Sequence, residues 1–261
     1  MIKNIFSFKP KNSPPIYGNC LLSLFESSNL KIIDIGSGNG IGPGIGNFSE
    51  FANYINYFPC DPTININNNS NTQWKSITYI REAIWTESGT ESLNIMNQPG
   101  LSSLLKPNQS VVNTFNNRAD YNIKSTQPIK TIKLNEAAKK YQFENAGFLS
   151  IDTQGTELEI LKSGQSLLET SMFGIYIETE FQELYKGQSL FADIDKYLRN
   201  IGFILFDIDR VLMRRHNYST EYYSRKQISH CHCLYFKPPE NIDGQTNESL
   251  TNKFEQLLLI A

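Results

Sequence analysis

The stretch from Leu30 to Gly40 constrains the fold of this chain more than any other segment. A short, mostly apolar run leads to Asp34, and glycines follow at positions 36, 38 and 40. Glycine has no Cβ, so it adopts positive φ easily and lets backbone N–H groups come close to a ligand. We therefore predict a buried β-strand that runs into a ligand-binding loop, as at the start of a βαβ unit.

The spacing of these glycines separates two classes of cofactor. A dinucleotide site needs G-x-G-x-x-G, whose third glycine packs the helix against the strand and places a pyrophosphate at the helix N-terminus. No register of the glycines from Gly36 to Gly46 gives that spacing. The loop therefore favours a cofactor without a diphosphate, and S-adenosylmethionine is the leading candidate. The alternative is a glycine-rich turn that binds no nucleotide.

Asp61 supports a nucleoside ligand. It follows an apolar, aromatic run and lies 21 residues after Gly40. In a βαβ unit, an acid at the end of the second strand accepts hydrogen bonds from ribose hydroxyls. The predicted cofactor-binding residues in this part of the chain are Asp34, Gly36, Ser37, Gly38, Asn39, Gly40 and Asp61.

Strand-like and helix-like segments alternate along the chain, which predicts βαβ units and a mostly parallel sheet. The predicted strands are residues 31–35, 57–60, 76–85, 147–152, 173–178, 202–209 and 231–237. The predicted helices are residues 48–57, 135–143, 156–169 and 191–200. No clear helical period separates the last two strands, so we expect a closing hairpin with an antiparallel final strand.

We expect one main domain over residues 31–240, preceded by an extension over residues 1–30. Apolar residues at helical spacing, from Leu250 to Leu258, predict a C-terminal helix within residues 241–261. Residues 98–129 have little periodicity. A connection of this length is either a lid or substrate loop, or a surface excursion with no role in binding.

Composition narrows the class of protein. The net charge is −2, so no basic surplus favours nucleic acid or an anionic membrane. The four cysteines are too few and too scattered for a disulfide framework, and no apolar stretch has the length of a membrane span. We therefore expect a cytoplasmic protein that binds no nucleic acid.

A second motif begins at Ile151. The sequence Ile151-Asp152-Thr153-Gln154-Gly155-Thr156-Glu157 ends a buried strand, turns at a glycine and enters a helix that reaches Leu161-Lys162-Ser163-Gly164. Together with the first glycine loop, this resembles the FkbM-type S-adenosylmethionine-dependent methyltransferases. That family has a strand, an Ile-Asp-x-x-Gly-x-Glu turn and a Leu-x-x-Gly helix.

The resemblance extends over about residues 31–209. Ala83 followed by Gly89, Ser102-Ser103-Leu104 and the Tyr185-Lys186-Gly187 turn are similar to further family elements. Two features depart from the family pattern: the glycine loop is longer and richer in glycine, and Asp61 replaces a glutamate.

The resemblance implies an α/β class I methyltransferase fold, which is Rossmann-like. We expect a seven-stranded, mostly parallel sheet with an antiparallel last strand and helices on both faces. It also implies roles for individual residues. Gly36 to Asn39 would surround the methionine part of the cofactor, and Asp61 would hold the ribose. Glu82 and Ala83 would lie near the adenine, and Asp152 near the sulfonium. The residues expected on the substrate side are Ser102, Ser103 and Tyr185.

Methyl transfer to a hydroxyl requires removal of its proton. The candidate bases are Asp152, the pair Glu178 and Glu180 on one strand face, and the histidines at positions 216, 230 and 232. Asp152, Glu178 and Glu180 are also candidate oxygen ligands of a divalent metal such as Mg²⁺. The alternative role for the two glutamates is hydrogen bonding that fixes loops.

The sequence His230-Cys231-His232-Cys233 does not predict a zinc site, because alternate residues of a strand face opposite sides of the sheet. The favoured function is O-methylation of a sugar, a glycan or another small-molecule hydroxyl. The alternatives are a non-catalytic S-adenosylmethionine-binding module and a methyltransferase that acts on a protein or an amine.

Overall fold

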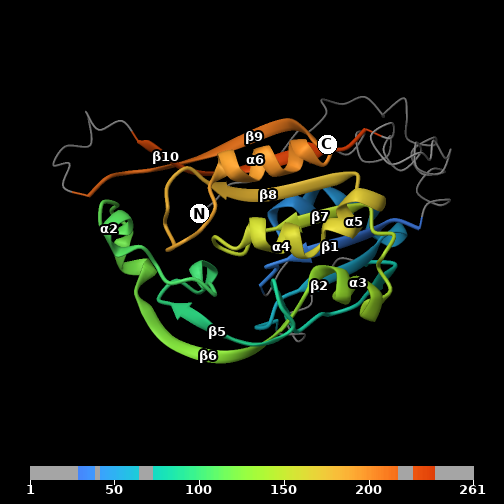
Figure 1. Ribbon diagram of the computed structural model, residues 1–261, viewed down its shortest axis with the longest axis horizontal. Helices are drawn as coiled ribbons and strands as arrows, with labels where there is room; N and C mark the ends of the chain where they lie inside the picture. The colour runs from blue at the N-terminus through green and yellow to red at the C-terminus, as the bar shows by residue number, and fades with distance from the viewer. Residues whose placement is uncertain (1–28, 39–41, 65–72, 217–225, 239–261) are drawn as a thin grey trace.

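The computed structural model describes residues 29–38, 42–64, 73–216 and 226–238. These residues form a seven-stranded sheet flanked by helices, with a smaller three-stranded sheet beside it (Figure 1). The predicted N-terminal extension, except for its last two residues, and the predicted C-terminal helix lie outside the described residues. So do Asn39 and Gly40 of the glycine loop.

The main sheet has the strand order β3-β2-β1-β7-β8-β10-β9. Its strands are β1 (Lys31–Ile35), β2 (Asn56–Cys60), β3 (Ser76–Ile77), β7 (Phe148–Ile151), β8 (Gly174–Glu180), β9 (Ile204–Met213) and β10 (Gln227–Phe236). The first five pair in parallel, and β10 is antiparallel to both of its neighbours, β8 and β9. The predicted α/β fold with an antiparallel last strand is therefore confirmed.

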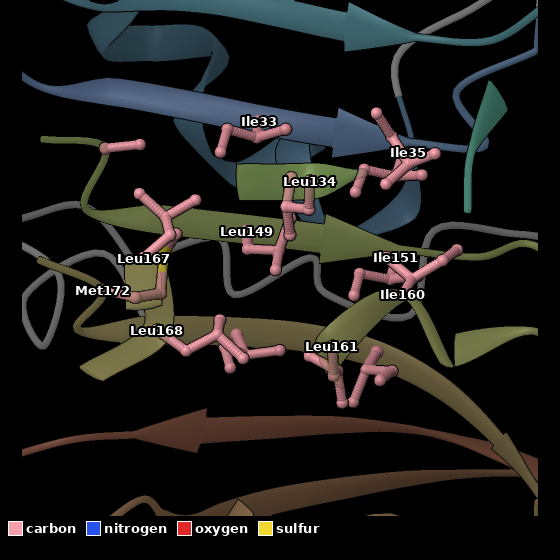
Figure 2. Close-up of a cluster of buried hydrophobic side chains, with 14 of the residues drawn as sticks. Ile33, Ile35, Leu134, Leu149, Ile151, Ile160, Leu161, Leu167, Leu168 and Met172 are labelled. Carbon is pink, nitrogen blue, oxygen red and sulfur yellow. The ribbon is translucent and has the colours of Figure 1, made fainter. Parts of the chain in front are cut away.

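Four α-helices contribute to one hydrophobic core on one face of this sheet. They are α3 (Leu134–Tyr141), α4 (Glu157–Ser163), α5 (Gln165–Thr170) and α6 (Phe191–Asn200). Figure 2 shows part of this core, with Ile33 and Leu149 on the strands and Leu161 and Leu168 on the helices. Each fully buried side chain of this kind contributes roughly 1.5–3 kcal/mol to stability.

The opposite face of the sheet is covered near β1 and β7 by a 3₁₀ helix, η1 (Pro43–Tyr54). Ile45 and Phe48 of η1 pack against Ile32, Phe148 and Tyr176 of the sheet. The sequence predicted a helix over residues 48–57, and the structure starts it earlier, at Pro43. Proline is favoured in the first turn of a helix because its missing N–H would have no partner there.

The single strand predicted over residues 76–85 is wrong. Residues in this range form β3 in the main sheet and β4 (Ala83–Ile84) in the small sheet. The chain leaves the main sheet after Ile80, whose backbone still pairs with Asp61 and Pro59. Likewise, the helix predicted over residues 156–169 is divided into α4 and α5 at Gly164.

The small sheet is the largest feature that the sequence did not predict. It joins β4 to β6 (Ile123–Ile132) and β6 to the antiparallel β5 (Gly89–Met96). The first residues of both strands, 89–92 in β5 and 123–128 in β6, are exposed and mostly polar, so they show no alternation that would reveal a strand. In Figure 1 the hairpin and α2 (Gln109–Val112) extend to one side of the main sheet.

The segment between β5 and β6 also contains η2 (Pro99–Leu101) and η3 (Arg118–Tyr121). It has its own small core, in which Val112, Phe115 and Tyr121 pack with Leu184 and Tyr185 from the segment after β8. This contact holds the segment at the carboxyl edge of the main sheet. None of the helices in the described parts of the chain has the length and apolarity needed to cross a membrane.

Gly36 occupies a tightly constrained backbone position. Its φ is +82°, and a Cβ built on it would lie 1.8 Å from the backbone oxygen of Asp152. Its N–H donates to the carbonyl of Cys60 at 2.9 Å. Gly36 therefore lies where the ends of β1, β2 and β7 converge.

Replacing this glycine tests the packing. We expect Gly36→Ala to lower the free energy of unfolding by more than about 3 kcal/mol, because both the left-handed backbone and the close contact oppose a side chain. Gly46→Ala is the matched control: a Cβ at this position would have no atom within 4 Å, so the change should stay within about 1 kcal/mol. Urea denaturation measures the free energy of unfolding of both variants. Equal losses in the two would contradict the close backbone contact at Gly36.

Candidate functional site

A cavity of about 490 Å³ opens at the carboxyl ends of β1, β2 and β7. Its sheet-side wall comes from the segments that follow these strands, namely Gly36, Gly38, Asp61, Pro62, Thr63, Asp152, Thr153, Gln154 and Thr156. The other wall comes from the small sheet and the segment between β5 and β6, namely Ala83, Ile84, Leu93, Ile95, Pro99, Gly100, Ser102, Ser103, Leu104 and Ile129. Open α/β sheets bind ligands at this edge.

Gly38 and Asp61 face each other across the glycine loop. Gly38 has a φ of +57° and no atom within 4 Å of a Cβ built on it. Its N–H donates to Oδ2 of Asp61 at 2.9 Å, and Thr63 donates to Oδ1 through its N–H and its hydroxyl. A carboxylate has about four acceptor positions, so Asp61 is held in place and still has capacity for a ligand hydroxyl.

Two predicted cofactor residues lie behind this wall. Asp34 is only 1% exposed, and its Oδ2 accepts hydrogen bonds from the Gly42 N–H at 2.9 Å and the Tyr57 hydroxyl at 2.5 Å. Burial raises the pKa of Asp34 to about 6, although these hydrogen bonds oppose the rise. Asp34 thus connects the start of the glycine loop to its end. Ser37 is also buried, and its hydroxyl has no hydrogen-bond partner in the described part of the chain.

The structure places Glu82 away from the pocket that Ala83 lines. Glu82 forms an ion pair with Lys140 and accepts a hydrogen bond from the Tyr141 hydroxyl at 2.7 Å. Partial burial would raise its pKa, but the hydrogen bonds from Lys140 and Tyr141 outweigh burial and lower it. Glu82 instead lines a neighbouring cavity of about 480 Å³, together with Arg81 and Lys130.

The turn after β7 is organised by buried polar side chains. Gln154 has a φ of +61°, and its Nε2 donates to Oδ1 of Asp152 at 2.6 Å and to Oε1 of Glu178 at 2.8 Å. The carboxylate of Glu157 accepts the N–H groups of Thr153 at 2.9 Å and Gly155 at 3.1 Å. Sequence reasoning did not include Gln154 or Glu157 among the site residues, although both lie in the second motif.

The antiparallel pairing of β8 and β10 places two glutamates opposite two histidines. Glu178 lies opposite His232, and Glu180 lies opposite His230. Oε2 of Glu178 is 3.3 Å from Nε2 of His232 and 3.7 Å from Nε2 of His230. The intervening cysteines face the other side, where they are fully buried in the helix-side core.

The charges of this group are strongly coupled. Burial, reinforced by the charge of Glu178, raises the pKa of Asp152 well above its usual range. Burial would also raise the pKa of Glu178, but the hydrogen bond with His232 and the two histidine charges lower it. Burial opposes the charge on His232, yet Glu178 raises the pKa of this histidine. The pKa shifts of Glu178 and His232 therefore favour their charged forms, whereas that of Asp152 favours its protonated form.

The predicted carboxylate set needs one correction. Ligand atoms of Asp152, Glu178 and His232 lie within 4.8 Å of one another, and Glu180 is not part of that group. Glu180 is 1% exposed, and burial, followed by the charges of Glu157 and Glu178, raises its pKa well above the usual value. His216 lies elsewhere, with its N–H donating to the carbonyl of Thr114.

Residues 34–205 match the model of the methyltransferase FkbM domain, which is more than half of the chain. The chain belongs to this family. It is therefore a methyltransferase, and its family uses S-adenosylmethionine as methyl donor. A search among curated proteins gave no significant match.

Solved structures similar to this FkbM methyltransferase include precorrin-6y C5,15-methyltransferase from Geobacter metallireducens GS-15. The two share 12% identity over 88% of this chain and 92% of that chain, with a TM-score of 0.36. A SAM-dependent methyltransferase from Anabaena variabilis ATCC 29413 shares 10% identity over 80% of this chain and 77% of that chain, with a TM-score of 0.37. An antibiotic-related methyltransferase shares 12% identity over 87% and 97% of the two chains, with a TM-score of 0.34.

The residues expected on the substrate side of the FkbM methyltransferase occupy two different positions. Ser102 and Ser103 line the pocket, and the Ser103 hydroxyl donates to the carbonyl of Gln154 at 2.8 Å. Tyr185 is fully buried behind the wall. Its hydroxyl donates to the Leu101 carbonyl at 2.8 Å and lies 3.2 Å from Oε1 of Gln154. Tyr185 therefore positions Gln154 and the segment after β5.

The bracing of the glycine loop by Asp34 predicts a pH-dependent effect. The pKa of Asp34 is about 6 in the folded protein, above the unfolded value of about 3.9. The favourable contribution of Asp34 to the free energy of unfolding is therefore fully present below about pH 4 and is lost as the pH rises through about 6. Tyr57→Phe removes a donor, which should cost about 1.5–3 kcal/mol at pH 8, where Asp34 is ionised, and about 0.5–1.5 kcal/mol at pH 5.

Urea denaturation at pH 5 and pH 8 measures this difference. Tyr197→Phe is the control, because the Tyr197 hydroxyl is buried and has no hydrogen-bond partner among the described residues. It should change stability equally at both pH values. A loss for Tyr57→Phe that is the same at pH 5 and pH 8 would contradict the role of Asp34.

Proposed function

We propose that this FkbM methyltransferase transfers the methyl group of S-adenosylmethionine to a hydroxyl of a sugar, a glycan or another small molecule. One observation carries the proposal. Asp152 lines the pocket and is connected through Gln154 to the buried Glu178–His232 pair. A proton acceptor therefore lies at the wall of the site where the cofactor is expected.

The residues present suit this cofactor. Gly38 leaves open space beside a left-handed backbone, and Asp61 has acceptor capacity for ribose hydroxyls. Ala83 and Ile84 offer an apolar surface for the adenine. When bound, the cofactor supplies a methyl group that its sulfonium makes electrophilic.

The remaining chemistry belongs to the chain. Asp152 accepts the hydroxyl proton, and its raised pKa makes it a stronger base than an ordinary carboxylate. Gln154 and the Glu178–His232 pair hold Asp152 in position, which supports an in-line approach of the acceptor. Ser102 and Ser103 lie on the same cavity and are the residues that we assign to the acceptor side.

Residues 98–129 act as the lid in this proposal. Five of the cavity-lining residues fall in the first part of this segment, namely Pro99, Gly100, Ser102, Ser103 and Leu104. Because water competes with the acceptor, a cover over the site favours methyl transfer. The net charge of −2 supports an acceptor other than nucleic acid. The free, buried Cys60, Cys231 and Cys233 support a reducing, cytoplasmic compartment.

The ribose assignment is tested at Asp61. We expect Asp61→Asn to weaken S-adenosylmethionine binding at least about tenfold, because hydrogen bonds to a charged acceptor are worth about 1.5–3 kcal/mol. Isothermal titration calorimetry measures the dissociation constant. Asp207→Asn, which changes an exposed acid on β9, is the matched control and should bind as the wild type does. An unchanged constant for Asp61→Asn would remove the assignment.

The acceptor chemistry is tested at Asp152. We expect Asp152→Asn to reduce methyl transfer by roughly 10²–10⁴-fold, the usual contribution of a general base, while cofactor affinity changes less than about threefold. Mass spectrometry of a panel of sugars, phenols and amines identifies the methylated atom. Transfer to amines alone would overturn the proposal, as would a variant that keeps more than a tenth of the wild-type rate.

A further inference from the structure

We propose that Asp152, Glu178 and His232 bind a divalent metal ion at the acceptor end of the cofactor pocket. The role of the ion in methyl transfer rests on the proposed function, whereas the binding site rests on the geometry alone. Its ligands are two carboxylate oxygens and one imidazole nitrogen, which lie within 4.8 Å of one another. Neighbouring ligand atoms that are each about 2.1 Å from an ion are about 3 Å apart. Movement of each side chain by up to about 1 Å towards the ion would therefore complete the site.

The side chains around the three ligands already hold them in place. Nε2 of Gln154 donates to Oδ1 of Asp152 and to Oε1 of Glu178. The other oxygen of Glu178, Oε2, lies 3.3 Å from Nε2 of His232, so these two ligand atoms already face each other. The Tyr176 ring stacks on His232, with a centroid distance of 5.5 Å and an interplanar angle of 15°. Such contacts orient the ligands of a metal site before the ion binds.

A separate observation also indicates a missing cationic partner. Glu180 follows Glu178 on the same face of β8 and is 1% exposed, yet neither of its oxygens has a hydrogen-bond partner in the described parts of the chain. The second oxygen of Glu157 is likewise buried without a partner there. Buried carboxylates are costly unless they are hydrogen-bonded or meet opposite charge. A divalent ion bound by Asp152, Glu178 and His232 would bring positive charge to the face of β8 that carries Glu180.

The ligand set selects the class of ion. Mg²⁺ and Ca²⁺ prefer oxygen ligands alone, whereas imidazole suits first-row transition metals. The structure has His232 as the third ligand, where the sequence predicted Glu180. This site is therefore expected to bind Mn²⁺ and neighbouring transition metals in preference to Mg²⁺. The cysteines cannot join His232 as ligands of a zinc ion, because Cys231 and Cys233 lie on the opposite face of β10. Through Asp152 on the pocket wall, the ion is placed to bind an acceptor oxygen.

Electron paramagnetic resonance tests the site, because Mn²⁺ loses its sharp solution signal when it binds to protein. We expect the wild-type protein, stripped of metal with EDTA and dialysed, to bind one Mn²⁺ per chain. His232→Gln should weaken this binding at least about tenfold, since it removes a ligand. His230→Gln is the matched control and should stay within about threefold of the wild type. Its Nε2 lies 3.7 Å from Glu178, but His230 is outside the ligand group.

Circular dichroism and S-adenosylmethionine calorimetry on each variant show whether the fold and the cofactor site persist. The proposal is overturned if the wild type leaves the Mn²⁺ signal unchanged, if both histidine variants weaken binding equally, or if exhaustive chelation leaves methyl transfer unaltered. Loss of Mn²⁺ binding in His232→Gln but not in His230→Gln supports the metal site, whichever acceptor is methylated. Failure of the proposed O-methylation would instead appear as intact Mn²⁺ binding without transfer to any hydroxyl.

Discussion

The close approach of two loop backbones at Gly36 is the constraint on which the site depends. The absent side chain lets this residue lie against the carbonyl of Asp152, while its N–H binds the carbonyl of Cys60. The ends of three parallel strands therefore meet at one point. As a result, the glycine loop, Asp61 and Asp152 line a single cavity, although they come from distant parts of the chain.

Buried polar side chains then give each loop its shape. Asp34 joins the beginning of the glycine loop to its end, and Glu157 binds the N–H groups of the turn after β7. Gln154 links that turn to Glu178, and Tyr185 links it to the segment after β5. None of these interactions requires a ligand, so the pocket is organised before cofactor or acceptor binds. Preorganisation of this kind favours catalysis, because little has to move during the reaction.

Sequence reasoning reached the glycine loop, Asp61 and Asp152 of the pocket wall because the motifs are local. Gly38 and Asp61 belong to one βαβ unit, and the spacing within such a unit determines where its loop and its acid lie. Asp34 and Glu82 show the limit of this reasoning. Both are acids within predicted strands, but Asp34 faces inwards to Tyr57 and Glu82 pairs with Lys140, which is distant in sequence. The polar hairpin of β5 and β6 lacked the alternation by which a strand is recognised.

The sequence by itself determined the parallel sheet, the glycine loop and the separation of His232 from Cys233, because strand periodicity and glycine spacing are properties of neighbouring residues. Only the tertiary structure decided which histidine meets which acid. The register of β10 against β8 places His232 rather than His230 opposite Glu178, next to Asp152. Pairing between strands depends on the packing of the whole sheet, and a shift of one residue would have turned both histidines to the opposite face.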